Sequence, residues 1–215
     1  MAHAPSIRPP GEPLKIVLTG APGSGKSTAV ARLGLAEAFA DWRARLGGVT
    51  VVREAATQVY SSRKQRWDEL DLEQQRDAQR AIYNLQMAQE SEAAAAAKVA
   101  GHRVILLDRG SVDGAAYWPD GPAAYWQDLQ TSAAVEIARY DAILLLESGA
   151  AIGIYDGKDS NDTRFEDAKA ALENATKLAG LWSAHPHRRE VAAESAFDRK
   201  LAHIAAVIEQ FVSGK

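Results

Sequence analysis

The stretch Gly20-Ala-Pro-Gly-Ser-Gly-Lys-Ser-Thr28 decides the fold of this chain. It matches the pattern G-x-x-x-x-G-K-[ST] and follows a short apolar run, Leu14-Lys-Ile-Val-Leu-Thr19, which is typical of a buried parallel strand. The glycines let the backbone turn so that successive N–H groups converge on a phosphate, and a following helix adds its positive end. The sequence therefore predicts a phosphate-binding loop between a strand and a helix.

The positions of this loop have expected roles. The nucleotide-binding positions are Gly20, Ala21, Pro22, Gly23, Ser24, Gly25, Lys26, Ser27 and Thr28. Lys26 is expected to neutralise β- and γ-phosphate oxygens, and the Ser27 hydroxyl is expected to bind Mg²⁺. The alternative is a glycine turn that only caps a helix, but such a turn explains neither the lysine nor the hydroxyl beside it.

The composition narrows the class of protein. The 215 residues are 47% hydrophobic and 25% charged, as in ordinary folded proteins, and 25 basic against 28 acidic residues give a net charge of −3. The chain therefore has no overall basic field to recruit nucleic acid, and it has no cysteine for disulfides or thiolate metal sites. No apolar run approaches the roughly 20 residues of a membrane span. We expect a cytoplasmic protein without a membrane span or a nucleic-acid partner, and a homodimer stays open.

Predicted strands and helices alternate along the chain. Apolar runs after the first strand predict further strands at residues 49–53, 103–108, 140–147 and, more weakly, 189–193. Apolar stripes predict helices that run on from the loop to Leu46, over about 70–100, and through 197–211. Repeated strand–helix–strand units imply right-handed crossovers, a mainly parallel sheet and helices on both of its faces.

Charged residues follow directly on two of the predicted strands. Glu54 follows the second strand, and Asp108 and Arg109 follow the apolar run of the third. Ligands bind at the carboxyl ends of parallel strands, so these side chains should lie near the phosphates. Glu54 can orient or deprotonate an attacking hydroxyl, Asp108 can hold Mg²⁺ through water, and Arg109 can bind substrate or stabilise developing charge. The structural alternatives are helix caps for the two carboxylates and a surface salt bridge for the arginine.

Further motifs extend the pattern beyond the loop. They are Arg-Glu-Ala-Ala56, Asp-Arg-Gly-Ser-Val-Asp-Gly-Ala-Ala-Tyr-Trp118, Asn161-Asp-Thr-Arg-Phe-Glu166 and Trp-Ser-Ala-His-Pro186. Together with the loop they resemble the AAA-domain P-loop family related to the ribosylnicotinamide kinase domain, over roughly residues 14–212. More distant similarity extends to deoxynucleoside and thymidylate kinases. The resemblance implies an α/β fold of three layers, α/β/α, with a five-stranded parallel sheet of order 2-3-1-4-5.

The resemblance also implies roles for single residues. It implies that Glu54 lies near the acceptor hydroxyl, that Asp108 and Arg109 surround metal and phosphate, and that Arg164 lies on a lid at about 153–167. Arg164 has independent support, because its polar, glycine-containing surroundings are typical of a mobile closing segment. A solvated arginine paired with a neighbouring carboxylate is an equal alternative. The domain as a whole is expected to span residues 14–215, behind a flexible tail of residues 1–13.

Most of the candidate residues for the acceptor pocket follow the third predicted strand. Tyr117 and Trp118 fit either stacking on a flat ring or sealing of the helix layer. Asp113 fits either a contact to a ribose hydroxyl or a helix cap. Glu54 and Arg109 complete the set of candidate acceptor contacts.

These features together predict a P-loop kinase. We expect it to use ATP and Mg²⁺ as cofactors and to move the γ-phosphoryl group to a hydroxyl of a small acceptor, with nucleosides or nucleoside-like molecules preferred. The chain lacks the N-K-x-D and L-S-G-G-Q motifs, which disfavours regulatory GTPases and transporter ATPases. GTP stays open as an alternative donor. The competing hypothesis is a nucleotide-dependent ATPase-like module or switch that signals to a protein or lipid partner.

Overall fold

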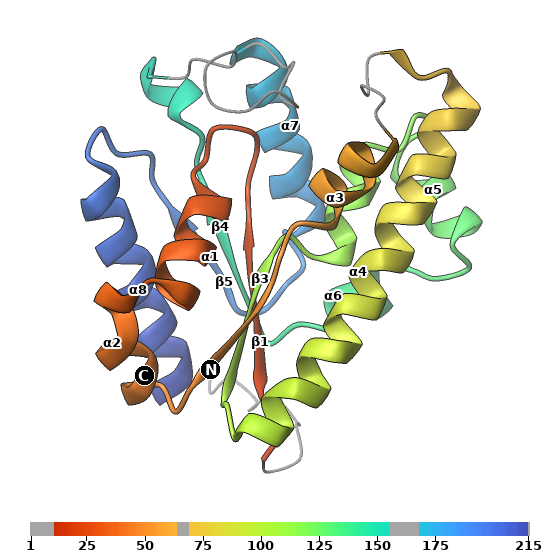
Figure 1. The fold of residues 1–215 in the computed structure, drawn as a ribbon. Helices are drawn as coiled ribbons and strands as arrows, with labels where there is room; N and C mark the ends of the chain where they lie inside the picture. Colours follow the sequence, from red (N-terminus) through yellow and green to blue (C-terminus); the bar gives the residue numbers. More distant parts are fainter. Residues whose placement is uncertain (1–10, 64–68, 155–167, 215) are drawn as a thin grey trace.

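The computed structural model describes residues 11–63, 69–154 and 168–214 (Figure 1). Five parallel strands form one sheet in the order β2-β3-β1-β4-β5, which confirms the expected fold class and strand order. The strands are β1 (Leu14–Thr19), β2 (Val49–Val52), β3 (Val104–Asp108), β4 (Ala142–Leu146) and β5 (Arg188–Val191). Their ends differ from the predicted ones by no more than two residues.

Helices cover both faces of the sheet (Figure 1). They are α1 (Lys26–Leu35), α2 (Ala40–Arg45), α3 (Ala55–Arg63), α4 (Leu72–Ala100), α5 (Pro122–Asp128), α6 (Ala133–Ile137), α7 (Ala168–Leu181) and α8 (Phe197–Ser213). Short 3-10 turns are η1 (Glu37–Phe39), η3 (Ser111–Ala116) and η4 (Gly149–Ile152). Helices α1, α2 and α8 lie on one side of the sheet, and α4 lies on the other with α3 packed beside it.

Two hydrophobic clusters hold the layers together. Successive side chains of a strand point to opposite faces, so Ile16 and Leu18 of β1 pack toward α1 and α8, whereas Val17 packs toward α4. All three side chains are fully buried. Because both faces are covered, the central strands read as continuous apolar runs, and this is why the sequence revealed them so clearly.

The strand register places the carboxyl ends of β1, β2 and β3 beside one another. Leu18 of β1 pairs with Asp108 of β3, and Val52 of β2 pairs with Leu107 of the same strand. The parallel strands therefore end at one edge of the sheet. The phosphate loop leaves β1 at this edge, beside the segment that carries Glu54 after β2.

The prediction of one helix running from the loop to Leu46 is wrong. Helix α1 ends at Leu35, Ala36 is extended with ψ 141°, and the chain turns through η1 into α2. The guanidinium of Arg43 stabilises the break, since its Nη1 donates to the carbonyls of Leu33 and Ala36 at 3.2 and 2.8 Å. Leu35 is consequently 53% exposed rather than part of the core.

The prediction of a long helix at about 70–100 matches α4 closely. Asp71 caps its start by accepting from the Gln74 amide, and the Gln74 side chain accepts in return from the Asp71 amide. Gly101 ends the helix in the left-handed region with φ 69°. None of the helices in the described ranges combines the length and the apolar character that crossing a lipid bilayer requires.

Candidate active site

The phosphate loop turns directly from β1 into α1. Gly25 is the residue before α1 and has φ 80°, a backbone conformation that favours glycine. A Cβ atom at this position would also lie 2.7 Å from the ring of Phe197, so the first residues of α8 pack closely against the loop. Lys26 begins α1 and is only 3% exposed. The structure therefore has the strand, loop and helix that the motif predicts.

Three successive backbone carbonyls of the loop accept hydrogen bonds from residues outside it. The carbonyl of Pro22 accepts from Ser148 Oγ at 2.6 Å, that of Gly23 from the Gly149 amide at 3.2 Å, and that of Ser24 from Lys200 Nζ at 2.9 Å. We call Ser148, Gly149 and Lys200 the rear contacts. Sequence analysis did not find them, because they come from the segment after β4 and from α8, far along the chain.

Glu54 and Arg109 meet across the ends of β2 and β3. Arg109 Nε donates to Glu54 Oε1 at 2.5 Å, and Thr57 Oγ1 donates to Glu54 Oε2 at 2.8 Å. Arg109 Nη1 donates to Asp113 Oδ2 at 3.2 Å. The guanidinium also lies 5.5 Å from the centre of the Tyr117 ring. One arginine thus joins two carboxylates and an aromatic ring, all of them from the predicted set.

Glu54 and Arg109 each stabilise the charged form of the other. Burial by itself raises the pKa of Glu54, but the positive charges of Arg109 and Lys26 and the hydrogen bonds from Arg109 and Thr57 outweigh it and lower the pKa to about 2. Burial acts to lower the pKa of Arg109, but Tyr117, Glu54 and Asp113 raise it well above its ordinary value. Glu54 therefore stays anionic and Arg109 stays cationic at neutral pH.

The backbone of Arg109 is held in an unusual conformation. Its φ is 76°, in the left-handed region that residues other than glycine seldom adopt. Its amide donates to the Leu18 carbonyl at 3.0 Å, and its carbonyl accepts from Gln86 Nε2 at 3.3 Å. The Ser111 amide donates to Tyr140 Oη at 2.7 Å, and that hydroxyl donates to the buried carboxylate of Glu90 at 2.7 Å. Side chains of α4 and of the segment before β4 therefore fix the turn that aims the guanidinium.

Asp108 lies at the end of β3 and is 4% exposed. Burial raises its pKa and the neighbouring Glu54 charge adds to this rise, while Lys26 and a hydrogen bond with Ser27 act in the opposite direction. Among the described residues, Asp108 Oδ1 is a buried oxygen that receives no hydrogen bond. A carboxylate and a hydroxyl are hard oxygen ligands of the kind Mg²⁺ prefers, so the pair Asp108 and Ser27 fits that ion.

Protein side chains alone form no metal site within residues 11–63, 69–154 and 168–214. The described parts of the chain contain no group of three or more His, Cys, Asp or Glu side chains able to hold a metal ion. Mg²⁺ does not require such a group, because it is usually held by one or two protein oxygens together with waters and substrate phosphates.

Asp113 is the centre of a buried network rather than the cap of a helix. Its Oδ2 accepts from Thr19 Oγ1 at 2.7 Å in addition to Arg109, and its Oδ1 accepts from Trp182 Nε1 at 2.7 Å. The side chain is 3% exposed. Asp113 therefore ties the end of β1 and the residue that follows α7 to the arginine of the site. Sequence analysis assigned no role to Thr19, the last residue of the first strand, or to Trp182, the first residue of the Trp-Ser-Ala-His-Pro186 motif.

The two aromatic candidates occupy different places. Tyr117 lies against the Arg109 guanidinium, at the site. Trp118 is 5% exposed and packs against Tyr125, with ring centres 5.4 Å apart. Trp118 therefore belongs to a third core cluster in the helix layer, which matches the packing alternative. Arg164 lies outside the described residues.

A cleft of about 970 Å³ opens beside these groups. Ser27, Glu54 and Asp108 line its end next to the phosphate loop, and the rest of its wall comes from α1, β2, α3 and α4. Fewer than half of the residues that line the cleft are aliphatic, and the others carry hydroxyl, amide or charged groups. The arrangement provides a concave space in which a small molecule can meet a group bound at the loop.

Comparison with known proteins supports this description. A family model described as an AAA domain matches residues 15–199. A comparison with curated protein sequences gave no match. Among solved structures, the NadR protein in complex with NR has a TM-score of 0.63 and 16% sequence identity, and the match covers 94% of this chain and 50% of that one.

Two further structures have the same fold. The NadR protein in complex with NAD and AMP-PNP has a TM-score of 0.58 and 14% identity, covering 94% of this chain and 50% of that chain. Thymidylate kinase from Ehrlichia chaffeensis has a TM-score of 0.60 and 14% identity, covering 92% of this chain and 99% of that chain. The present chain spans about half the length of the NadR chains.

Proposed function

Since the chain belongs to the AAA-domain family, we propose that it is a P-loop kinase, which uses Mg·ATP to phosphorylate a hydroxyl of a small, nucleoside-like acceptor. The observation that carries the proposal is the ion pair between Glu54 and Arg109, which lies at the carboxyl edge of the sheet with Lys26 close enough to lower the pKa of the glutamate. Such a pair can orient an attacking hydroxyl and stabilise the charge that develops on the transferred group.

The donor side uses the loop. Backbone amides and the Lys26 ammonium bind the β- and γ-phosphates, and Ser27 and Asp108 hold Mg²⁺. When bound, Mg²⁺ neutralises charge on the phosphate oxygens. The buried Asp108 Oδ1, which has no hydrogen-bond partner among the described residues, supports this assignment.

The acceptor side uses Glu54. A carboxylate with a pKa of about 2 is a weak base, so its main role is to accept a hydrogen bond from the acceptor hydroxyl and to aim that oxygen at the γ-phosphorus. Phosphoryl transfer passes through a loose transition state in most analyses, and it needs positioning more than early deprotonation. The lowered pKa thus favours the orienting role over the deprotonating one.

The transition state is stabilised by fixed positive charge. Arg109 is held by Glu54, Asp113 and Tyr117, so its guanidinium needs little reorganisation when negative charge develops nearby. We propose that Arg164 adds a second cation when the acceptor is bound.

The acceptor class is supported by two observations. The cleft beside Glu54 has room for a molecule with a flat or aliphatic body. The NadR structures, which share the fold, hold NR in one case and NAD with AMP-PNP in the other, and the third structure is a thymidylate kinase. We therefore place nucleosides and nucleotides first among the acceptors to be tested.

One experiment tests the proposal and identifies the acceptor. The purified protein is incubated with Mg·ATP and a pooled panel of nucleosides, nucleotides and small metabolites, and mass spectrometry searches for species that gain one phosphoryl group. Lys26→Ala serves as the control. A product that depends on Lys26 establishes the kinase. ATP binding without any product would instead favour a nucleotide switch, whose partner would be sought by capture in the ATP-bound state.

A further inference from the structure

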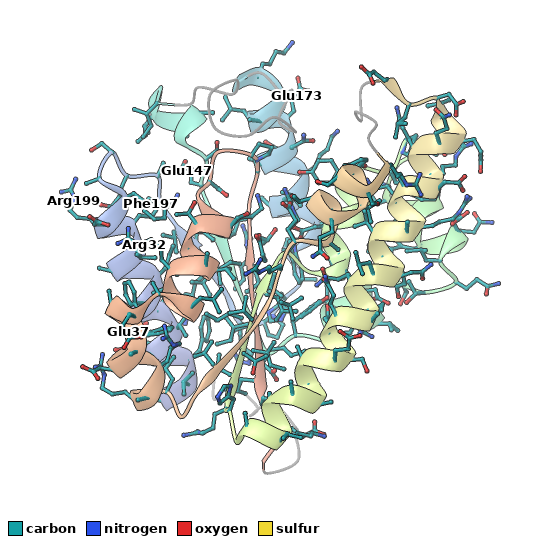
Figure 2. All side chains as sticks on the ribbon, in the orientation of Figure 1. Arg32, Glu37, Glu147, Glu173, Phe197 and Arg199 are labelled. Carbon is teal, nitrogen blue, oxygen red and sulfur yellow. The ribbon has the colours of Figure 1, made fainter. Side chains whose placement is uncertain are left out.

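Lys200 occupies a position on α8 where packing alone would call for an apolar residue. Phe197, Leu201, Ile204 and Ile208 form the apolar stripe of this helix, and Lys200 lies beside them with only 4% of its surface exposed. Lysine is seldom buried so completely. Figure 2 labels Phe197 and Arg199 at the start of α8, and the guanidinium of Arg32 on α1 lies 6.0 Å from the centre of the Phe197 ring.

The ammonium of Lys200 donates hydrogen bonds to two backbone carbonyls. Its Nζ lies 2.9 Å from the Ser24 oxygen and 2.7 Å from the Glu147 oxygen. Glu147 is itself fixed to β5 and the residues after it, because its amide donates to the Val191 carbonyl and its carboxylate accepts from the Ala193 amide. One buried cation therefore joins the phosphate loop, the end of β4 and α8.

The direction of the Ser24 carbonyl fixes the direction of the next amide. None of the described peptide bonds is cis, and in a trans peptide the C=O and N–H groups point to opposite sides of the chain. The carbonyl of Ser24 points to Lys200, so the N–H of Gly25 points away from it. By the same geometry, the contact of Ser148 Oγ with the Pro22 carbonyl directs the Gly23 amide away from Ser148.

These peptide groups need such support because glycines flank them. Gly23 and Gly25 both have positive φ, and glycine allows a neighbouring peptide unit to rotate at small cost. A cation on the oxygen of a peptide group also polarises it, which strengthens its N–H as a hydrogen-bond donor. Lys200 thus acts on both the direction and the strength of the Gly25 amide.

We propose that Lys200 is a positioning residue for the β-phosphate of the bound nucleotide, and that Ser148 acts in the same way on the amide of Gly23. The inference rests on the nucleotide binding proposed above. It assigns the rear contacts a role in ligand recognition in addition to packing. Neither residue touches the nucleotide itself.

The test compares nucleotides with and without a β-phosphate. The affinities of ADP and AMP are measured by calorimetry for the wild type, for Lys200→Met and for the matched control Arg199→Met, which removes an exposed cation one residue away. We expect Lys200→Met to weaken ADP binding by about tenfold or more and AMP binding by less than about twofold. Arg199→Met is expected to change neither affinity.

The outcomes separate this inference from the proposed function. A wild type that binds neither ADP nor ATP would overturn the proposed function and the inference with it. A wild type that binds ADP, combined with equal losses for ADP and AMP in Lys200→Met, would overturn the inference alone and leave Lys200 a packing residue.

A second variant keeps the test open if Lys200→Met does not fold, as judged by its circular dichroism and unfolding midpoint. Ser148→Ala removes a buried hydroxyl that donates to the Pro22 carbonyl and also accepts from the Ala150 amide, and it buries no new group. We expect a loss of about threefold or more that is again confined to ADP. Unchanged discrimination between ADP and AMP in Ser148→Ala would then overturn the inference.

Discussion

Arg109 Nε lies 2.5 Å from Glu54 Oε1, and this ion pair is the link between the ends of β3 and β2. The two side chains are only 14% and 20% exposed, so each is the main counter-charge of the other in a largely dry setting. A substitution of either partner therefore frees the direction of the one that remains, and loss of Arg109 also raises the pKa of Glu54.

Glu54→Gln is expected to lower kcat for phosphoryl transfer by at least about 100-fold, because the neutral amide is a weaker acceptor for the substrate hydroxyl and forms no ion pair with Arg109. The ATP dissociation constant should stay within about threefold of the wild type, since binding at the loop remains. Steady-state kinetics and calorimetry measure the two quantities. Glu209→Gln, which removes a carboxylate from an exposed ion pair with Arg45, is the matched control. Full turnover in Glu54→Gln would end its assignment to the acceptor.

Lys26→Ala should weaken ATP binding by about tenfold or more, because a buried cation next to the phosphates is lost. Calorimetric titration with Mg·ATP measures the effect. Lys98→Ala, whose ammonium is exposed and pairs only loosely with Glu12, should bind ATP as the wild type does. Equal affinities in Lys26→Ala and the wild type would contradict a working phosphate loop.

Trp182→Phe should destabilise the fold by about 1–3 kcal/mol, because Asp113 Oδ1 loses the indole N–H and stays buried without a donor. The variant keeps an aromatic ring in the core, which limits the cavity that it creates. The shift of the urea midpoint at constant m-value measures the loss. A change below about 0.5 kcal/mol would mean that Asp113 does not depend on this bond.

The buried His185 should make stability depend on pH. Burial lowers its pKa, although a hydrogen bond to the Tyr140 carbonyl acts in the other direction. As the pH falls through the ordinary value of 6.5, the unfolded chain binds a proton that the folded chain does not, so the free energy of unfolding decreases. This loss continues down to the lower pKa of the folded state.

Urea unfolding at about pH 8 and about pH 5.5 measures this dependence. His185→Gln should show a flatter change in stability between the two conditions than the wild type. His203→Gln replaces an exposed histidine of α8 and should follow the wild type. An unchanged slope in His185→Gln would show that another group carries the pH dependence.

Gly34→Ala is expected to destabilise the fold by about 1–3 kcal/mol, although alanine normally favours a helix over glycine. A Cβ at this point of α1 would lie within van der Waals radii of Val51 Cγ2 on β2. The double variant Gly34→Ala/Val51→Ala removes the obstacle and should recover most of the lost stability. Thermal unfolding of both variants and of Val51→Ala measures the coupling. Additive effects of the two substitutions would contradict the close packing of α1 on β2.

Much of the fold was predictable because its signals are local. The loop motif indicates a strand before it and a helix after it. Continuous apolar runs identify strands that are covered on both faces. The edge of the sheet that carries Glu54, Asp108 and Arg109 followed from the same reasoning. The break at Ala36 was missed because its cause, the guanidinium of Arg43, acts from the next helix.

The remainder of the site depends on contacts between distant segments. Trp182 reaches Asp113, Tyr140 supports the turn after Arg109, and Lys200 reaches the phosphate loop from α8. No pattern along the chain encodes such pairings. A lysine inside the apolar stripe of α8 is the one sequence signal that was available for Lys200, since a charge at a core position implies a specific partner.

The rear contacts also bear on how the protein is made. Ser148 lies 126 residues after the carbonyl that it holds, and Lys200 lies 176 residues after its own. A ribosome therefore releases the phosphate loop well before the groups that orient it. Until α8 docks, the phosphate loop lacks the hydrogen bond from Lys200 that orients the Ser24 carbonyl. If nucleotide binds as proposed, it would therefore stabilise molecules in which α8 has docked over those in which it has not.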